Sequence, residues 1–429
     1  MTAIHRRDIE NAMKAMSSEA LRVLALAMRP EASEMKEEGL VFVGMAGMED
    51  PARPEACESV AAFKEAGVKT VMITGDYMDT AFAIAKRLGI AENKEECMSG
   101  SQIDAMNEKQ FAAAVREKSV FARVSPKHKV SIVKALKSGG HIVAMTGDGV
   151  NDAPSLKAAD IGIAMGKNGT DVARGAADIV LTDDKFSTIE KAIEEGRGIY
   201  ANIKKSVLFL LSSNFGEIMT MFAAVIMGIA APLKASHILW INLITDSLPA
   251  LALGIDKNDT KSMMSCPPRP PKESLFAQGG LTLTCFYGAL IAAISLAAFF
   301  KVPYDILRSA GMPFSVGAVG ELLSQPEILN RAQTYAFTVL GISQLFHAAG
   351  MRDTRISVFK MKWGKSGLMI IAFAVGLLLQ LAVTEVPYLI RVFGTVHLSP
   401  GEWGGLLFLS AMPILAHEVF VLCSGKSKR

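Results

Sequence analysis

The sequence has few cysteines and almost no excess of either charge. Its five cysteines are spread over 429 residues without a close pair, so neither a disulfide framework nor a zinc site is expected. The formal net charge of +3 gives no support for a nucleic-acid partner. No apolar run follows Met1–Arg7, so we expect no signal peptide there. These absences leave the apolar residues as the main guide to the class of protein.

Apolar residues are abundant and unevenly distributed. They make up 50% of the sequence, while Asp, Glu, Lys and Arg still make up 20%. The long apolar runs gather after Val207, and the part before it is mixed in character. A length of 429 residues is enough for two or three domains. We therefore expect a polar domain joined to a membrane domain.

Short apolar runs alternate with helical patterns between Leu40 and Leu181. The expected strands cover 40–44, 68–73, 119–122, 141–144, 161–165 and 179–181. The expected helices cover 54–65, 79–88, 123–139 and 153–159. Alternation of strands and helices of this length predicts an α/β fold with a doubly wound parallel sheet.

One ten-residue string, Met145–Pro154, concentrates polar chemistry at the end of an expected strand. It reads Met-Thr-Gly-Asp-Gly-Val-Asn-Asp-Ala-Pro, and open α/β sheets place their ligands at the carboxyl ends of strands. The carboxylates of Asp148 and Asp152 suit a hard cation such as Mg²⁺. The alternative is an ordinary Asp-Gly turn with a solvated carboxylate. The whole string favours the metal site.

Four side chains in this part of the chain suit phosphoryl transfer. A phosphoryl group in transfer carries negative charge and needs a cation, a lysine and neutral donors around it. Thr74 offers a hydroxyl, Lys129 a positive charge, Asp148 a ligand for Mg²⁺ and Asn151 an amide. These residue types together predict a phosphate pocket.

The Met145–Pro154 string resembles the hinge motif of the P-type cation-transporting ATPases. The resemblance extends over essentially the whole chain, is strongest to calcium pumps of the sarcoplasmic-reticulum type and their bacterial relatives, and covers only the second half of such a pump. It implies a haloacid-dehalogenase-like phosphotransferase core with ATP as substrate and Mg²⁺ as cofactor. The catalytic residues it implies are Thr74, Lys129, Asp148, Asn151 and Asp152, the last as support for the Mg²⁺ site. The nucleotide-binding residues it implies are Arg22, Thr74, Gly75, Asp76 and Arg123. For Arg22, an ordinary arginine on an edge strand is the alternative.

One element of the resemblance is missing. The pumps accept phosphate on the aspartate of an Asp-Lys-Thr-Gly-Thr string, and no such string occurs in this sequence; Asp184-Lys185-Phe186 and Asp256-Lys257-Asn258 do not match it. The resemblance divides the chain into the tail of a nucleotide-binding domain (1–36), a phosphorylation domain without its nucleophile strand (37–195), and a stalk with membrane helices (196–429). The expected partners are the N-terminal half of the pump and membrane lipid.

Six apolar segments follow a charged helix that is expected to act as a stalk. They are about Val207–Ala231, Ile238–Leu253, Leu281–Phe300, Tyr335–Ala349, Leu368–Val383 and Leu406–Val421. Lysines and arginines gather between the fourth and fifth segments and after the sixth. With six spans, these basic residues lie on the side of the phosphate domain, as the positive-inside rule requires. We expect a multi-pass protein, in a plasma membrane of bacterial type, with the phosphate domain and C-terminus in the cytoplasm.

Polar residues inside the first two segments predict an ion site. Glu217 follows Asn214 by three residues, and Asn242, Thr245 and Asp246 have the spacing of one helix face. A charged side chain at mid-bilayer costs roughly 2.5–3.5 kcal/mol on insertion scales, so two carboxylates need a reason. An all-oxygen cage for Ca²⁺ is one reason, and hydrogen bonds between helices are the alternative.

The resemblance assigns these residues to the transported ion. Asn214, Glu217, Asn242 and Asp246 match ligands of the calcium pumps, and Gln344 stands where the reticulum type has a glutamate, which weakens one of two possible calcium sites. Two other functions stay open from the sequence. The chain could belong to a pump for Mn²⁺, Na⁺ or H⁺, or it could be a truncated product without catalytic activity.

Overall fold

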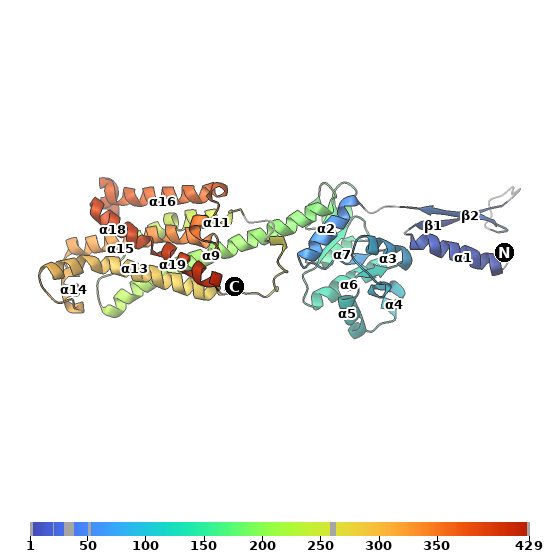
Figure 1. Ribbon diagram of the computed structural model, residues 1–429, viewed down its shortest axis with the longest axis horizontal. Coiled ribbons are helices and arrows are strands. Elements are labelled where there is room, and N and C mark those ends of the chain that lie inside the picture. The colour runs from blue at the N-terminus through green and yellow to red at the C-terminus, as the bar shows by residue number, and fades with distance from the viewer. Residues whose placement is uncertain (1–2, 20, 30–37, 50–52, 258–262, 427–429) are drawn as a thin grey trace. The chain divides into compact units, whose positions relative to one another are not determined.

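The computed structural model describes residues 3–19, 21–29, 38–49, 53–257 and 263–426. The chain divides into two compact units, one formed by residues 1–195 with 259–272 and the other by residues 196–258 with 273–429 (Figure 1). The boundary expected at residue 36 lies outside the described residues.

The first unit begins with a helix and an antiparallel hairpin. Helix α1 (Ala3–Ser18) precedes strand β1 (Arg22–Met28), which pairs antiparallel with β2 (Val41–Met48). Placing the apolar run at 40–44 in the parallel sheet was therefore wrong. An apolar run does not specify the direction of its partner strand, and here Val41 and Val43 are exposed rather than buried between two layers of helices.

The other strands of this unit are parallel, as predicted, but they form two sheets. The first has the order β3 (Met72–Ile73), β5 (Val120–Ala122), β4 (Cys97–Ser99), and the second the order β6 (Ala144–Gly147), β7 (Ile161–Met165), β8 (Ile179–Leu181). Strand β6 begins later than expected, because the N–H of Val143 donates to the Asp160 carboxylate at 2.9 Å instead of to a neighbouring strand.

Helices join these strands. They are α2 (Pro54–Glu65), α3 (Met78–Arg87), α4 (Gly100–Asp104), α5 (Glu108–Glu117), α6 (Pro126–Ser138), α7 (Ala153–Ala158) and α8 (Asp171–Ala176), with a 3₁₀ turn η1 (Lys94–Glu96). The start of α6 is well specified by sequence. Ser125 caps it, Pro126 occupies the first turn, and His128 Nδ1 accepts a hydrogen bond from the Ser125 N–H at 3.2 Å. This cap positions Lys129, which lies in the first turn of α6.

The second unit is helical. Helix α9 (Phe186–Met227) starts in the first unit and is followed by α10 (Ala235–Trp240), the π-helical segment η2 (Ile241–Thr245) and α11 (Ser247–Gly254). The remaining helices are α13 (Gly280–Ser309), α14 (Val316–Leu323), α15 (Pro326–Met351), α16 (Gly367–Glu385), α17 (Pro387–Phe393), α18 (Pro400–Ser410) and α19 (Met412–Lys426), with 3₁₀ turns η3 (Val358–Lys360) and η4 (Trp363–Lys365). Among the described residues, four helical stretches are long and apolar enough to cross a membrane: Phe186–Met227, Gly280–Ser309, Gly367–Glu385 and Pro400–Cys423.

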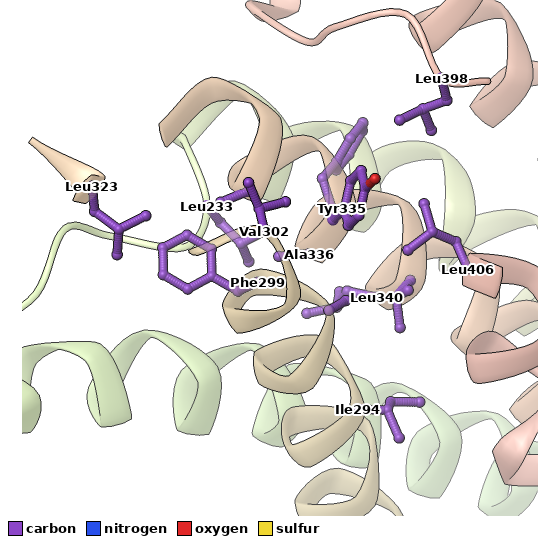
Figure 2. Close-up of a cluster of buried hydrophobic side chains, with 14 of the residues drawn as sticks. Leu233, Ile294, Phe299, Val302, Leu323, Tyr335, Ala336, Leu340, Leu398 and Leu406 are labelled. Atoms are coloured by element: carbon purple, nitrogen blue, oxygen red, sulfur yellow. The ribbon is translucent and has the colours of Figure 1, made fainter. Parts of the chain in front are cut away.

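Helix α15 lies at the centre of this unit. It packs along α13 and contacts α16, α18 and α19 (Figure 1). Every residue from Ala332 to Leu345 is buried. Phe299 and Val302 of α13 join Leu340 of α15 in the largest buried cluster of apolar side chains (Figure 2). Because other helices surround α15, it can carry polar side chains that a lipid-facing helix would not tolerate.

Candidate functional site

The loop after β3 brings together three of the residues expected at the nucleotide and phosphate. The Thr74 hydroxyl donates to the Asp76 carboxylate at 2.8 Å and accepts from the Asp76 N–H at 3.1 Å. The N–H of Arg123 donates to the Asp76 carbonyl at 3.0 Å. Arg123 has a φ of +51°, and its guanidinium carbon lies 4.2 Å from the centroid of the Tyr77 ring. This loop, together with Arg123 directly after β5, therefore presents a hydroxyl, a carboxylate and a guanidinium.

The loop after β6 is organised by an ion pair. The Lys129 ammonium donates to the Asp152 carboxylate at 2.6 Å, with 17% and 11% of the two side chains exposed. The Gly149 N–H donates to the second Asp152 oxygen at 3.3 Å. A Cβ on Gly147 would lie 2.5 Å from the Asp152 Cβ, so only glycine fits at that position. Asp152 thus holds the lysine and the loop in one arrangement.

Asp148 and Asn151 occupy the exposed rim of this loop. No described residue forms a hydrogen bond or ion pair with the Asp148 carboxylate, whereas Asp152 is already engaged by Lys129. Among the described residues, no group of three or more His, Cys, Asp or Glu side chains could hold a metal ion. Mg²⁺ commonly keeps several waters and is bound by one or two carboxylates together with substrate phosphate. The single free carboxylate of Asp148 is therefore enough for a Mg²⁺ ion of this kind.

Asp184 holds a neighbouring loop, residues 166–170, which contacts the loop after β6. The sequence pattern gave no sign of this role for Asp184. Its carboxylate accepts from the N–H groups of Gly166, Lys167 and Asn168 at 2.6, 3.1 and 3.0 Å. The same loop continues to Thr170, whose N–H donates to the Asp148 carbonyl at 2.8 Å. Burial alone would raise the pKa of Asp184, but these three N–H groups and the Arg53 guanidinium hold that pKa below its usual range.

Arg22, one of the residues expected to bind the nucleotide, lies in the hairpin of the first unit. Arg22 is the first residue of β1 in the hairpin, and its side chain lies outside the described residues. Its role stays a prediction, as do the roles of the other residues expected at the phosphate.

In the second unit, three of the expected ion-site residues are in direct contact. Glu217 of α9 is 5% exposed. Its two carboxylate oxygens accept from the amide of Asn242 in η2 at 3.0 Å and from the amide of Gln344 in α15 at 3.3 Å. Residues from three separate helical segments therefore converge on one buried carboxylate.

Thr245 and Asp246 lie next to this cluster, at the point where the helix is irregular. The Asp246 N–H donates to the Ile241 carbonyl at 2.9 Å, five residues back, and the Ser247 hydroxyl donates to the Asn242 carbonyl at 2.9 Å. Thr245 and Asp246 are each 1% exposed. Neither the Thr245 hydroxyl nor either Asp246 carboxylate oxygen has a hydrogen-bond partner among the described residues.

The structure adds two residues to this region, and one expected residue makes no side-chain hydrogen bond with the described residues there. Asn214 is half-buried on α9, and no hydrogen bond of the described residues engages its side chain. Two further buried side chains lack partners there, the Ser213 hydroxyl and the Gln380 amide. Gln380 had a signal in the sequence, because it is the one polar residue in the run Gly376–Val383.

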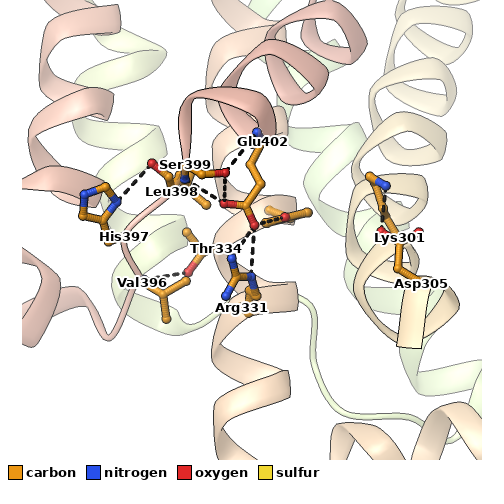
Figure 3. Close-up of polar contacts among 10 residues, drawn as sticks. Lys301, Asp305, Arg331, Thr334, Val396, His397, Leu398, Ser399 and Glu402 are labelled. Carbon is orange, nitrogen blue, oxygen red and sulfur yellow. Dashed lines mark hydrogen bonds and ion pairs between the residues drawn. The ribbon is translucent and has the colours of Figure 1, made fainter. Parts of the chain in front are cut away.

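A separate polar network joins α15 to the start of α18. Glu402 accepts from the side chains of Arg331 and Tyr335 and from the Ser399 N–H at 2.7 Å (Figure 3). A cavity of about 90 Å³ beside it is lined mainly by apolar atoms, with Lys301 and Tyr335 among the lining residues. All carboxylate oxygens of Glu402 are engaged, so this network is a structural link rather than an ion site.

Two protein families match the chain, one mainly in each of the two units. Residues 230–423 match the family described as cation transporting ATPase, C-terminus, and residues 9–160 match the haloacid dehalogenase-like hydrolases. The chain is 48% identical over 432 residues to calcium-transporting ATPase 1 of Bacillus cereus, covering 98% of this chain and 47% of that protein. It is 41% identical over 414 residues to the calcium-transporting ATPase of Bacillus subtilis, covering 95% and 44%. It is 38% identical over 410 residues to calcium-transporting ATPase type 2C member 2 of Rattus norvegicus, covering 96% and 41%. The chain spans about half the length of these relatives.

Proposed function

We propose that the chain belongs to the P-type cation-transporting ATPases, corresponds to their C-terminal half and forms part of an ATP-driven pump that moves Ca²⁺ across a membrane. The observation that carries this proposal is the buried Glu217, contacted by Asn242 and Gln344 beside the unpartnered carboxylate of Asp246. Asn214 and Thr245 complete the proposed set of ligands. The relatives at 38–48% identity named above are calcium-transporting ATPases, which supports Ca²⁺ as the ion.

The chemistry of the cluster favours Ca²⁺ as the transported substrate. Ca²⁺ takes six to eight oxygen ligands in a flexible shell, and the cluster contains carboxylate, amide and hydroxyl oxygens. Pro249 lies four residues after Thr245 and has no N–H, so it cannot bond the Thr245 carbonyl as an ordinary helix would. This carbonyl is available as a further oxygen ligand. Two buried carboxylates also match the charge of a divalent cation.

We further propose six membrane spans. These are α9, the broken helix α10–η2–α11, α13, α15, α16 and α18–α19. Four of the spans contain the long apolar stretches; the other two are the broken helix and α15. Basic residues between α15 and α16, including Arg352 and Arg355, then lie on the cytoplasmic side with the phosphate domain. In this topology α9 acts as the stalk, because one continuous helix runs from the phosphorylation domain into the bundle.

The first unit would bind the nucleotide and stabilise the transferred phosphoryl group. Mg²⁺ held at Asp148 would neutralise charge on the phosphate oxygens. Lys129, fixed by Asp152, supplies a positive charge, and Thr74 and Asn151 supply neutral donors. Asp76, Arg123 and Gly75, together with Arg22, would contact ATP. The phosphate acceptor would come from the N-terminal half of the pump, because no Asp-Lys-Thr-Gly-Thr string occurs in these 429 residues.

Ca²⁺ binding to the full chain in lipid nanodiscs tests the ion site. Equilibrium dialysis with ⁴⁵Ca²⁺ should show saturable binding that is lost in the Glu217→Gln/Asp246→Asn double variant. Glu385→Gln is the matched control, since Glu385 is engaged by Trp403 at 3.0 Å at the end of α16 and should not affect binding. Absence of binding by the unaltered chain, or retained binding by the double variant, would overturn the proposal. Binding of Mn²⁺ or Na⁺ but not Ca²⁺ would identify a pump for another cation.

A second experiment tests the division of the catalytic machinery. The chain alone should form no acid-stable phosphoprotein from labelled ATP and Ca²⁺. Co-expression with the N-terminal half of the Bacillus cereus relative should restore a phosphorylated band on that half. Phosphorylation of the chain alone would show that another residue accepts the phosphate.

A further inference from the structure

Gln380 is a buried amide with no explanation in the packing of the bundle. It lies on α16, is 0% exposed, and follows three consecutive leucines. Neither its oxygen nor its nitrogen has a hydrogen-bond partner among the described residues. An unpaired amide is unfavourable in an apolar interior, so a residue that only filled space would be expected to be apolar.

The Gln380 amide lies near the helical segment that contains Thr245 and Asp246. A Cβ built on Gly341 of α15 would lie 3.2 Å from the Gln380 amide oxygen and 3.8 Å from the Thr245 hydroxyl. Both atoms therefore border the small space that the absence of a side chain at position 341 leaves open. Both lack partners, and so do the two carboxylate oxygens of Asp246, the residue after Thr245. Unpaired oxygens from η2 and α16 thus adjoin the same space beside α15.

We propose that Gln380 is a further ligand-binding residue of the transported-ion site, and that its amide oxygen acts with the Thr245 hydroxyl to extend the oxygen shell around a divalent cation. This inference rests on the proposed function. A neutral amide and a hydroxyl add oxygen ligands without adding charge. Such a shell favours Ca²⁺, which accepts six to eight oxygens, over Mg²⁺, which demands a compact octahedron. Gly341 keeps the space open, so α16 takes part in ion selection.

Another buried glutamine in the same unit provides a matched comparison. Gln333 of α15 is 5% exposed, and its amide nitrogen donates to the Ala231 carbonyl at 2.8 Å. It lies eleven residues before Gln344, which corresponds to about 16 Å along the helix. Its amide joins α15 to the loop between α9 and α10, and it lies too far along α15 to reach the ion.

Ca²⁺ affinity of the full chain in lipid nanodiscs tests the inference. Gln380→Met, which keeps the volume but removes the amide, should weaken Ca²⁺ binding at least about tenfold and reduce the preference for Ca²⁺ over Mg²⁺. Gly341→Ala should have a similar effect, because its methyl group occupies the shared space. Gln380→Glu should retain binding, because it keeps an oxygen at that position. Gln333→Met should bind Ca²⁺ within about twofold of the unaltered chain.

Thermal unfolding without Ca²⁺ separates an ion-binding role from a packing role. Gln380→Met should unfold at the same temperature as the unaltered chain or higher, since it removes an unpaired buried amide. Unchanged Ca²⁺ affinity in both Gln380→Met and Gly341→Ala, while Asp246→Asn abolishes binding, would overturn the role of Gln380 and leave the proposed function intact. Equal losses in Gln380→Met and Gln333→Met would overturn it as well, because they would indicate general damage to the bundle. No Ca²⁺ binding by the unaltered chain would overturn both proposals.

Discussion

The polar clusters of the two units differ in how their hydrogen bonds are satisfied. In the first unit, Lys129 and the Gly149 N–H engage both oxygens of Asp152. In the second unit, Asp246 is even more deeply buried, yet both its oxygens lack partners among the described residues, as do the Thr245 hydroxyl and the Gln380 amide. A satisfied cluster is stable as it is and can hold a catalytic side chain in place. A cluster without hydrogen-bond partners lowers the stability of the folded chain, and a cation bound to it would offset that loss.

The difference follows from the structure around each cluster. Loops at the ends of parallel strands expose N–H groups, and Asp152 and Asp184 accept from them. Helices inside a membrane use their backbone groups internally, so a side chain there can contact little except other side chains. A carboxylate in the bundle is therefore left with amides, hydroxyls and cations as partners.

The largest expected effect comes from neutralising the unsatisfied carboxylate. Asp246→Asn should weaken Ca²⁺ binding by at least about 100-fold, or about 2.7 kcal/mol, because one of two charged ligands is lost. Without Ca²⁺ the same variant should be at least as stable as the unaltered chain, because it removes an unpaired buried charge. ⁴⁵Ca²⁺ binding and thermal unfolding in nanodiscs measure the two quantities. A marked loss of stability without Ca²⁺ would show that Asp246 is a structural partner and would break the contrast.

The satisfied pair should show the opposite behaviour. Lys129→Met leaves Asp152 without its cation and should destabilise the loop after β6 by about 2.5 kcal/mol. Hydrogen exchange of the α7 amides (153 and 155–158) measures this local opening. The double variant Lys129→Met/Asp152→Leu should recover part of the loss, because it removes both charges. If the single variant exchanges as slowly as the unaltered chain, the pair contributes nothing to order in the loop.

A smaller effect is expected from replacing Gly147, which lies against the Asp152 side chain. Gly147→Ala places a methyl group 2.5 Å from the Asp152 Cβ and should cost about 2 kcal/mol through overpacking. Gly175→Ala is the control, because a Cβ there meets no atom within 4 Å, and it should be neutral or slightly stabilising. Hydrogen exchange of β6 and α7 should therefore speed up in the first variant alone. Equal exchange in both would show that the loop can relax around the methyl group.

The smallest effect concerns pH and Asp184. Its pKa in the folded chain lies below the ordinary 3.8, because the N–H bonds outweigh burial, so its stabilising contribution is present above 3.8 and is lost as the pH falls through the folded-state pKa. Asp184→Asn should be less stable than the unaltered chain at neutral pH, and the difference should shrink in acid. Asparagine suits the φ of +57° at this position, so the backbone is retained. Hydrogen exchange of residues 166–170 across this pH range measures the difference; a constant difference at all pH values would contradict the assignment.

Several features were predictable because they depend on local sequence. The parallel strands at 161–165 and 179–181 and the resemblance to calcium-transporting ATPases were predicted from patterns of neighbouring residues, and both are confirmed. The antiparallel hairpin was missed, since an apolar run does not encode the direction of its partner. The roles of the predicted phosphate and ion residues stay predictions, although the structure does bring Glu217, Asn242 and Gln344 together.

The sequence by itself determined which residues could carry charge, bend a helix or end a strand, because these properties belong to single residues and their near neighbours. The tertiary structure alone decided which of these polar side chains find hydrogen-bond or ion-pair partners. Asp152 and Asp246 are both aspartates directly preceded by a polar residue (Asn151 and Thr245), and only the packing of distant segments provides the first with a lysine and leaves the second unpaired. The same holds for Gln380, whose relation to Thr245 depends on the contact between α15 and α16 across a glycine. Long-range packing sets the partners of a buried polar group, and those partners set its energy.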